Sequence, residues 1–338
     1  MRFLVLIVSF FLITLLGDEH SSSSPKIKIA LLSSPSIIGK YSQSTYNVAM
    51  ATLLASGQSF ELTAYAMPNE SYETISTTIE KITNEKNVAI LAPLTLEGVK
   101  NLLKVQTSLP IIIPTVHRRD IGFTPDNIIF GSIDYEAQIK VLVPFMANSL
   151  AIFYGDSLVG SVLSKTTQSV ASESSKNIKN FSTYPVDIQG SNIVKYLARP
   201  TAFNKKSVIT HLPVVKTSML LSQMTFAGAH ETNILSTQIN YDPALITLTQ
   251  FPDRKNMIIA NSIIEQVPSI YEANALMNND LSFDWINYTT SVGTDYLISN
   301  FYELQRAYSM PIIDHQIIYP IELMHPKESG FEPFKGKR

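Results

Sequence analysis

Hydrophobic residues in the first part of the chain alternate between short apolar runs and longer stretches with helical spacing. Short runs rich in β-branched residues are typical of strands, and they occur at 26–32, 60–67, 88–92, 109–114 and 127–133. Helical spacing is found between these runs, at 41–55, 71–83 and 96–105. Continuous β-branched runs favour a parallel sheet that is covered by helices on both faces.

A second series with the same alternation begins near Asp134. Strands are predicted at 150–154, 181–186, 207–211, 233–239 and 257–260. Helices are predicted at 135–147, 157–175, 191–197 and 216–226. The pattern then gives a long helical region from Phe283 to Tyr308, interrupted at Gly293, and a last strand at 316–321.

Strand–helix alternation at this pace indicates βαβ units and an α/β fold. A length of 338 residues suits two domains. We therefore expect two doubly wound, Rossmann-like lobes joined by a hinge. The first lobe is expected at 26–133 and 263–308, and the second at 134–262 and 309–330. The chain should cross between the lobes near Ile133 and Ser262, and the 283–308 region should pack on the first lobe.

The amino-terminal residues 1–17 are interpreted as a signal peptide, which predicts export to the periplasm. Arg2 precedes an apolar run from Phe3 to Leu16, and polar residues follow Gly17. This run is shorter than the roughly 20 residues that a spanning helix needs. Leu15 stands where signal cleavage prefers a small residue, so an uncleaved inner-membrane anchor is an alternative. A buried core helix is another, and no later segment is long and apolar enough to span a bilayer.

The composition excludes several classes of protein. Apolar residues make up 45% and charged residues 16%, which suits a globular protein with a sizeable core. The net charge of −2 offers no general basic surface, so nucleic acid is not an expected partner. The absence of cysteine excludes disulfides, thiolate metal sites, cysteine nucleophiles and lipidation of an amino-terminal cysteine.

Five segments have the order and spacing of a known family: 28–32 followed by Gly39, 88–93, 109–115, 151–156 and 291–296. Together they resemble the type I periplasmic binding proteins, such as the branched-chain amino-acid receptors, although Ala92 replaces the glycine of the third-strand loop. Some domains of this fold are similar to the outer-membrane activators of penicillin-binding proteins. Those activators carry a lipoprotein cysteine, which this chain lacks.

The candidate binding residues follow predicted strands, because ligands of open α/β sheets bind at the carboxyl ends of strands and between lobes. The resemblance implies that an amino-acid carboxylate would lie near Thr95 and Thr115, and that Asp156 or Asp187 would meet its ammonium group. Ser34, Tyr154 and Gln238 also lie at strand ends, and their polar groups suit a small polar solute. The alternative is that the serines and threonines cap helices.

Signatures of catalysis and metal binding are missing. The sequence has no G-x-S-x-G elbow, no G-x-x-x-x-G-K-[ST] loop and no G-x-G-x-x-G loop. No two histidines have the i, i+4 spacing of a zinc-binding helix. The cluster His117-Arg118-Arg119-Asp120 could bind an anion, or it could be a solvated charged loop. We expect no enzyme, no cofactor and no metal.

These observations lead to two hypotheses. The first is a periplasmic binding protein that captures a small polar solute, such as an amino acid, between its lobes and serves a membrane transporter or a sensor. The second is a cell-envelope scaffold similar to the activators, which uses the same fold to bind a protein. Convergent polar groups in the cleft favour the first hypothesis, whereas an apolar or blocked cleft with an exposed apolar patch elsewhere favours the second.

Overall fold

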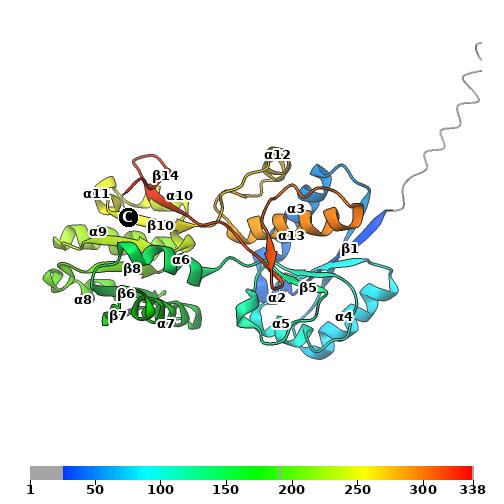
Figure 1. The fold of residues 1–338 in the computed structure, drawn as a ribbon, viewed down its shortest axis with the longest axis horizontal. Helices are drawn as coiled ribbons and strands as arrows, with labels where there is room; N and C mark the ends of the chain where they lie inside the picture. The colour runs from blue at the N-terminus through cyan, green and yellow to red at the C-terminus, as the bar shows by residue number, and fades with distance from the viewer. Residues whose placement is uncertain (1–25, 190–191, 337–338) are drawn as a thin grey trace, which may run out of the picture.

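The structure is a computed structural model that describes residues 26–189 and 192–336 (Figure 1). The predicted signal peptide lies outside these residues. Two lobes lie side by side, each built on one sheet. The first sheet contains β1 (Ile27–Ser33), β2 (Phe60–Ala66), β3 (Ala89–Leu91), β4 (Ile111–Ile113), β5 (Ile128–Phe130), β11 (Ile312–Ile313) and β12 (Gln316–Ile317).

The second sheet repeats this plan with later segments of the chain. It contains β6 (Ser149–Gly155), β7 (Asn180–Val186), β8 (Ser207–His211), β9 (Asn233–Ser236), β10 (Met257–Asn261), β13 (Glu322–Pro326) and β14 (Phe331–Pro333). The first five strands of each sheet are parallel, in the orders β5-β4-β3-β1-β2 and β10-β9-β8-β6-β7. The expected α/β fold with two doubly wound lobes is confirmed.

Helices cover both faces of the first sheet because its strands are apolar on both sides. These helices are α2 (Pro35–Ile38), α3 (Lys40–Ala55), α4 (Tyr72–Asn84), α5 (Leu96–Leu102), α12 (Pro268–Leu276) and α13 (Trp285–Tyr302). One core, which includes Ile75 and Ile90, lies on the α4 side of the sheet. Another, which includes Leu53, Ile112 and Leu297, lies between the sheet and the pair α3 and α13.

The second lobe is covered in the same way. Its helices are α6 (Tyr135–Leu142), α7 (Leu158–Glu173), α8 (Ile193–Tyr196), α9 (Val214–Ala227), α10 (Pro243–Leu248) and α11 (Phe251–Arg254). Four 3₁₀ helices interrupt the loops of the described chain: Arg118–Asp120, Val143–Phe145, Pro200–Phe203 and Gln238–Asn240. One core, with Phe153 and Leu220, faces α9, and another, with Ile139 and Ile152, lies under α6 and α7.

Helix α13 returns to the first lobe, as the sequence predicted. The Thr289 hydroxyl donates to the Pro114 carbonyl at 3.0 Å, and the Ser291 and Thr52 hydroxyls are 3.0 Å apart. The expected interruption at Gly293 is wrong, because the helix runs through it. A Cβ on Gly293 would lie 2.5 Å from Ile112 Cγ2, so the glycine permits close packing on β4.

Three segments of chain join the lobes (Figure 1): 131–134 after β5, 262–267 after β10 and 318–321 after β12. The lobe that contains β11 and β12 differs from the expectation, which placed residues 309–330 in the second lobe. Both strands belong to the first sheet, because Gln316 of β12 pairs with Phe130 of β5. Helix α13 ends at Tyr302, where Glu303 takes a left-handed conformation with φ of 52°.

Candidate functional site

An apolar cleft lies between the lobes, close to the points where the strand order of each sheet reverses. The reversal points are β1/β3 in the first sheet and β6/β8 in the second. Open α/β sheets bind ligands at such points, beyond the carboxyl ends of the strands. The cleft has a volume of about 540 Å³ and is lined by the loops after β1, β3, β4 and β5 and by the first turns of α7.

The α7 wall of the cleft is apolar and open to solvent. Leu158, Val159 and Val162 are 81%, 65% and 52% exposed, and all three line the cleft. Ser157 caps this helix by accepting from the Gly160 backbone N–H at 3.2 Å. A Cβ on Gly160 would lie 2.2 Å from the Gly155 carbonyl oxygen, so the glycine allows the start of α7 to pack tightly on β6.

The opposite wall belongs to the first lobe and is apolar as well. Its lining side chains include Ile38, Leu96, Val116, Trp285 and Ile286. Trp285 is the single tryptophan of the sequence and stands at the first turn of α13. An apolar body can therefore contact both lobes in this cleft, and Trp285 would report its arrival.

Three hydroxyl groups of the cleft make no hydrogen bond to any described residue: those of Tyr41, Tyr135 and Thr166. Burial raises the pKa of Tyr41, with a smaller contribution from Asp284. Burial also raises the pKa of Tyr135, helped by Tyr41. Both phenols therefore stay protonated at neutral pH and can donate hydrogen bonds to acceptor atoms of a ligand.

Thr95 and Thr115 line the cleft, but their hydroxyls are already used. Thr95 is the N-cap of α5: it accepts from the Gly98 N–H at 3.2 Å and donates to the Glu70 carboxylate. The Thr115 hydroxyl donates to the Leu94 carbonyl at 2.5 Å. Helix capping, the alternative considered for these threonines, thus accounts for Thr95.

The other four candidate residues do not line the cleft. Ser34 is buried and donates to the Met67 carbonyl at 3.0 Å. Tyr154 packs beside the core under α6 and α7, and the Asp156 carboxylate accepts from the Ile188 N–H at 3.3 Å. Gln238 is buried: its backbone N–H donates to the Gln138 side chain, and its side-chain oxygen accepts from the Ser262 N–H.

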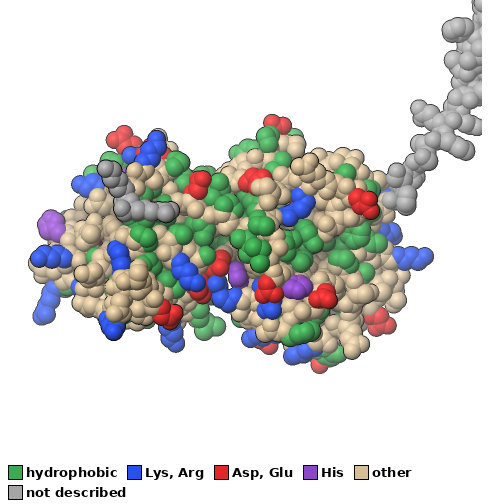
Figure 2. All heavy atoms as spheres, viewed as in Figure 1, with side chains coloured by type: hydrophobic (Ala, Val, Ile, Leu, Met, Phe, Trp, Pro, Cys, Tyr) green, Lys and Arg blue, Asp and Glu red, His purple; other side chains and the backbone are tan. Residues whose placement is uncertain are grey.

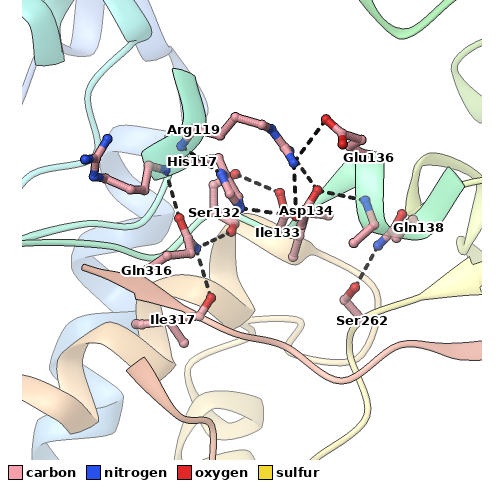
Figure 3. Close-up of polar contacts among 12 residues, drawn as sticks. His117, Arg119, Ser132, Ile133, Asp134, Glu136, Gln138, Ser262, Gln316 and Ile317 are labelled. Carbon is pink, nitrogen blue, oxygen red and sulfur yellow. Dashed lines mark hydrogen bonds and ion pairs between the residues drawn. The ribbon is translucent and has the colours of Figure 1, made fainter. Parts of the chain in front are cut away.

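The His117–Asp120 cluster, for which a solvated loop was one interpretation, joins the two lobes (Figure 3). Arg119 donates to the Asp134 carboxylate at 2.7 Å and lies 3.3 Å from the Glu136 carboxylate. His117 Nε2 lies 3.5 Å from the same Asp134 carboxylate. Asp134 also caps α6, because it accepts from the Ala137 N–H at 2.9 Å. Asp134 and Glu136 thus neutralise Arg119, and the Arg118 guanidinium donates to the Ile121 and Gly122 carbonyls, so both side chains are already engaged within the protein.

Burial and ion pairing shift the pKa values of Asp134 and His117 in opposite directions. Burial tends to raise the pKa of Asp134, but the hydrogen bonds from Arg119 and Ala137 and the charge of Arg119 lower it overall. Burial lowers the pKa of His117, and the opposing effect of Asp134 does not cancel the shift. The Arg119–Asp134 pair therefore stays ionised at neutral pH. Figure 2 shows charged side chains of both signs gathered where the lobes meet.

A second set of hydrogen bonds holds the connecting segments 131–134 and 262–267 to neighbouring elements (Figure 3). The Gln316 side chain accepts from the Arg118 N–H at 2.9 Å and donates to the Ser132 carbonyl at 2.9 Å. The Gln138 side chain donates to the Ser262 hydroxyl at 2.7 Å. The hinge is therefore held by polar contacts as well as by the chain itself.

Sequence reasoning missed the apolar wall of the cleft. The signal was present in α7, where Leu158, Val159, Val162 and Leu163 form a wider apolar arc than packing on one sheet requires. Leu163 is buried against the lobe, whereas the other three are exposed. No pattern in the sequence indicates that the hydroxyls of Tyr41, Tyr135 and Thr166 are unpaired, because hydrogen bonding of a hydroxyl depends on its neighbours in the folded protein.

Within residues 26–189 and 192–336, none of the helices has the length and apolarity needed to cross a membrane. The same part of the chain contains no group of three or more His, Cys, Asp or Glu residues arranged to hold a metal ion.

Comparison with solved structures identifies the fold as that of the type I periplasmic binding proteins, as the sequence segments indicated. An extracellular ligand-binding receptor from Verminephrobacter eiseniae has a TM-score of 0.67 and 10% identity, covering 91% of this chain and 99% of its own. The isoleucine complex of the branched-chain amino-acid binding protein LivJ from Streptococcus pneumoniae has a TM-score of 0.61 and 13% identity, with coverages of 92% and 100%.

The activator branch of the fold is matched as well. The C-domain of LpoA from Haemophilus influenzae, a regulator of PBP1A, has a TM-score of 0.63 and 10% identity, covering 91% of this chain and 99% of that domain. No family model and no curated protein matches the sequence. The likeness is one of fold, and these neighbours are binding and regulatory proteins.

Proposed function

We propose that this protein is a non-enzymatic binding protein of the periplasm that captures a solute between its lobes for transport or sensing. The observation that supports this function best is the position of the cleft. It lies beyond β1 and β3, where the strand order of the first sheet reverses, and against the start of α7 that follows β6 of the second sheet. It has free hydroxyl donors from α3 and α6 beside apolar walls. Closure of the lobes around a solute would exclude water and strengthen these hydrogen bonds.

The chemistry of the cleft changes which solute we propose. A small polar solute such as a free amino acid was the expectation, with Thr95 and Thr115 as its partners. The apolar walls and the internal bonds of both threonines favour a solute with a substantial apolar part. Its acceptor atoms would meet Tyr41, Tyr135 and Thr166, and Ser34, Tyr154, Asp156 and Gln238 would take no direct part.

Trp285 provides the test of this function. Binding of a solute with an apolar part should shift the Trp285 emission to shorter wavelength, because water leaves the indole environment. A solute at one hundred times its Kd should also stabilise the folded protein by about 2.7 kcal/mol. For a chain of this length the melting temperature should rise by roughly 4 °C, because the entropy of unfolding is about 2.1 cal/mol/K per residue.

A pair of matched variants makes the test specific. Val162→Asp places a charge on the cleft wall and should abolish the fluorescence response. Val194→Asp makes the same change at an equally exposed valine on α8, outside the cleft, and should leave the response intact. If no solute from a panel of amino acids, peptides, fatty acids and sugars changes the emission or the melting temperature, the solute-binding function is wrong.

A second function, that of an envelope scaffold for a protein partner, is favoured by the apolar walls of the cleft together with an exposed apolar surface outside it. Val215, Met219 and Phe226 follow one face of α9 and are 54%, 39% and 89% exposed. Such a stripe is typical of a protein contact. Recovery of one cell-wall enzyme from envelope extract by the protein, with loss of that capture in Met219→Asp, would favour the scaffold over the solute-binding function.

A further inference from the structure

The inter-lobe cleft adjoins a surface groove on the second lobe. The groove lies between α6 and α7 and has a volume of about 660 Å³. Glu136 and Thr166 line both the cleft and the groove, so the two spaces are next to each other. The combined site therefore starts at the apolar walls between the lobes and runs along α7 toward Ser175.

The size of this site exceeds the needs of a single amino acid. Sites of about 300–1,000 Å³ hold ligands of drug size, and the cleft alone is within that range. A free amino acid seated against Leu158 and Val162 would leave the groove empty. A ligand that fills both spaces must be long. Its apolar part would lie in the cleft, and more polar atoms would lie along the groove.

The lining of the groove has a polar rim above an apolar floor. Val143, Pro144 and Val170 line it together with Lys140 and Glu173. Lys140 is a donor that lies 2.6 Å from the Glu136 carboxylate, and Glu173 is an acceptor bonded by the Ser169 hydroxyl. The Ser175 hydroxyl also lines the groove and makes no hydrogen bond to a described residue.

A peptide backbone has the complementary chemistry. Each residue presents one N–H donor and one carbonyl acceptor, and these groups need partners when they leave water. The phenols of Tyr41 and Tyr135 and the hydroxyl of Thr166 can donate to carbonyls in or beside the cleft. Glu173 and Ser175 can accept from N–H groups along the groove. An acyl chain would meet the same rim with no polar atom to pair with it.

We infer that the ligand is a peptide of several residues, which places an apolar side chain between the lobes and extends its backbone along the α6–α7 groove. The inference rests on the proposed function and specifies the class of its solute. The walls formed by Leu158, Val159, Val162 and Trp285 hold the apolar side chain. The groove then selects for length rather than for one sequence, because its contacts are with the backbone.

The test uses four probes on the purified full chain: free leucine, octanoate, the dipeptide Leu-Leu and a pentapeptide library with leucine fixed at the third position. Binding to the unaltered chain is measured by Trp285 fluorescence and calorimetry, and binding to the variants, which carry a second tryptophan, by calorimetry alone. Ser169→Trp fills the groove at an exposed position on α7, and Thr225→Trp adds the same side chain at an exposed position on α9. Native mass spectrometry identifies which library members are retained.

If the ligand is a peptide, library pentapeptides should bind at least tenfold more tightly than leucine or octanoate. Ser169→Trp should weaken the binding of pentapeptides about tenfold and leave the binding of Leu-Leu unchanged. Thr225→Trp should change the affinity for neither. Equal or tighter binding of leucine or octanoate, or pentapeptide binding that Ser169→Trp does not weaken, overturns the peptide inference while the solute-binding function stands. Absence of binding by all four probes overturns the peptide inference, and the wider solute panel then decides the proposed function separately.

Discussion

The Arg119 guanidinium donates to the Asp134 carboxylate at 2.7 Å, and this bond joins the loop after β4 in the first lobe to the first turn of α6 in the second. Arg119 lines the cleft, and Asp134 is the last residue of the connecting segment 131–134. Its position makes it a restraint on the angle between the lobes. Opening the cleft on this side would have to lengthen or break it.

Loss of this pair should therefore loosen the lobes. Arg119→Ala removes two ion pairs that are partly exposed, so the free energy of unfolding should fall by only about 1 kcal/mol. The radius of gyration from small-angle X-ray scattering should increase, because the lobes can separate. Arg199→Ala, at an exposed arginine of the second lobe, should change neither quantity. Identical scattering curves for the two variants would show that the pair does not restrain the lobes.

His211 should make the protein sensitive to mild acid. It is buried at the end of β8, its Nε2 lies 2.7 Å from the Thr167 hydroxyl, and burial lowers its pKa to about 4. Between pH 6.5 and 4 the unfolded chain binds a proton at this histidine that the folded chain does not. Neutral His211 therefore makes its full contribution to the free energy of unfolding above pH 6.5. This free energy falls by on the order of 3 kcal/mol as the pH drops toward 4.

His211→Gln removes the side chain that takes up this proton, so the free energy of unfolding should depend less on pH. The measurement is urea unfolding at pH 7 and pH 4.5, compared with the exposed-histidine variant His230→Gln. The His211 variant should lose less stability than the control between the two pH values. An equal loss in both variants would assign the acid sensitivity to other groups.

Gly293 should not tolerate a side chain. A Cβ there would lie 2.5 Å from Cγ2 of the buried Ile112, and a β-branched side chain cannot move that methyl group away cheaply. Alanine would gain up to about 1 kcal/mol in helix propensity, but overpacking costs about 1–3 kcal/mol. Gly293→Ala should therefore destabilise the protein, whereas Asn300→Ala, at an exposed site on the same helix, should be neutral or stabilising. A stable Gly293→Ala protein in chemical denaturation would contradict this packing argument.

Thr95→Ala separates the capping role of this residue from a role in binding. The Thr95 hydroxyl caps α5 and donates to the buried Glu70 carboxylate, so its loss should cost about 1 kcal/mol or more without any ligand. The control is Thr225→Ala, at an exposed threonine whose hydroxyl makes no hydrogen bond to a described residue. Denaturation of both variants in ligand-free buffer is the measurement. If the two are equally stable, the hydroxyl is free for a ligand after all.

The sequence alone determined the class of fold. Runs such as Ile111–Ile113 and Leu150–Tyr154 are apolar on both faces, which only a sheet covered on both sides can bury, and their alternation with helical stretches required βαβ units. The β-branched and apolar patterns depend on neighbours within a few residues, so they can be interpreted without coordinates. Strand β12 lies at the start of the strand predicted at 316–321, but its short length and its place in the first sheet could not be predicted, because they depend on pairing with β5 and β11.

The site, by contrast, was decided by tertiary structure. Thr95 and Tyr41 both carry hydroxyl groups, and nothing local shows that the first hydroxyl is bonded to Glu70 while the second is free. Arg119 and Asp134 lie fifteen residues apart and meet only because β5 carries the chain to the hinge. The sequence determines which elements form, since this depends on local spacing. Packing determines which polar groups remain unpaired and which apolar side chains stay exposed, because both depend on contacts between distant segments.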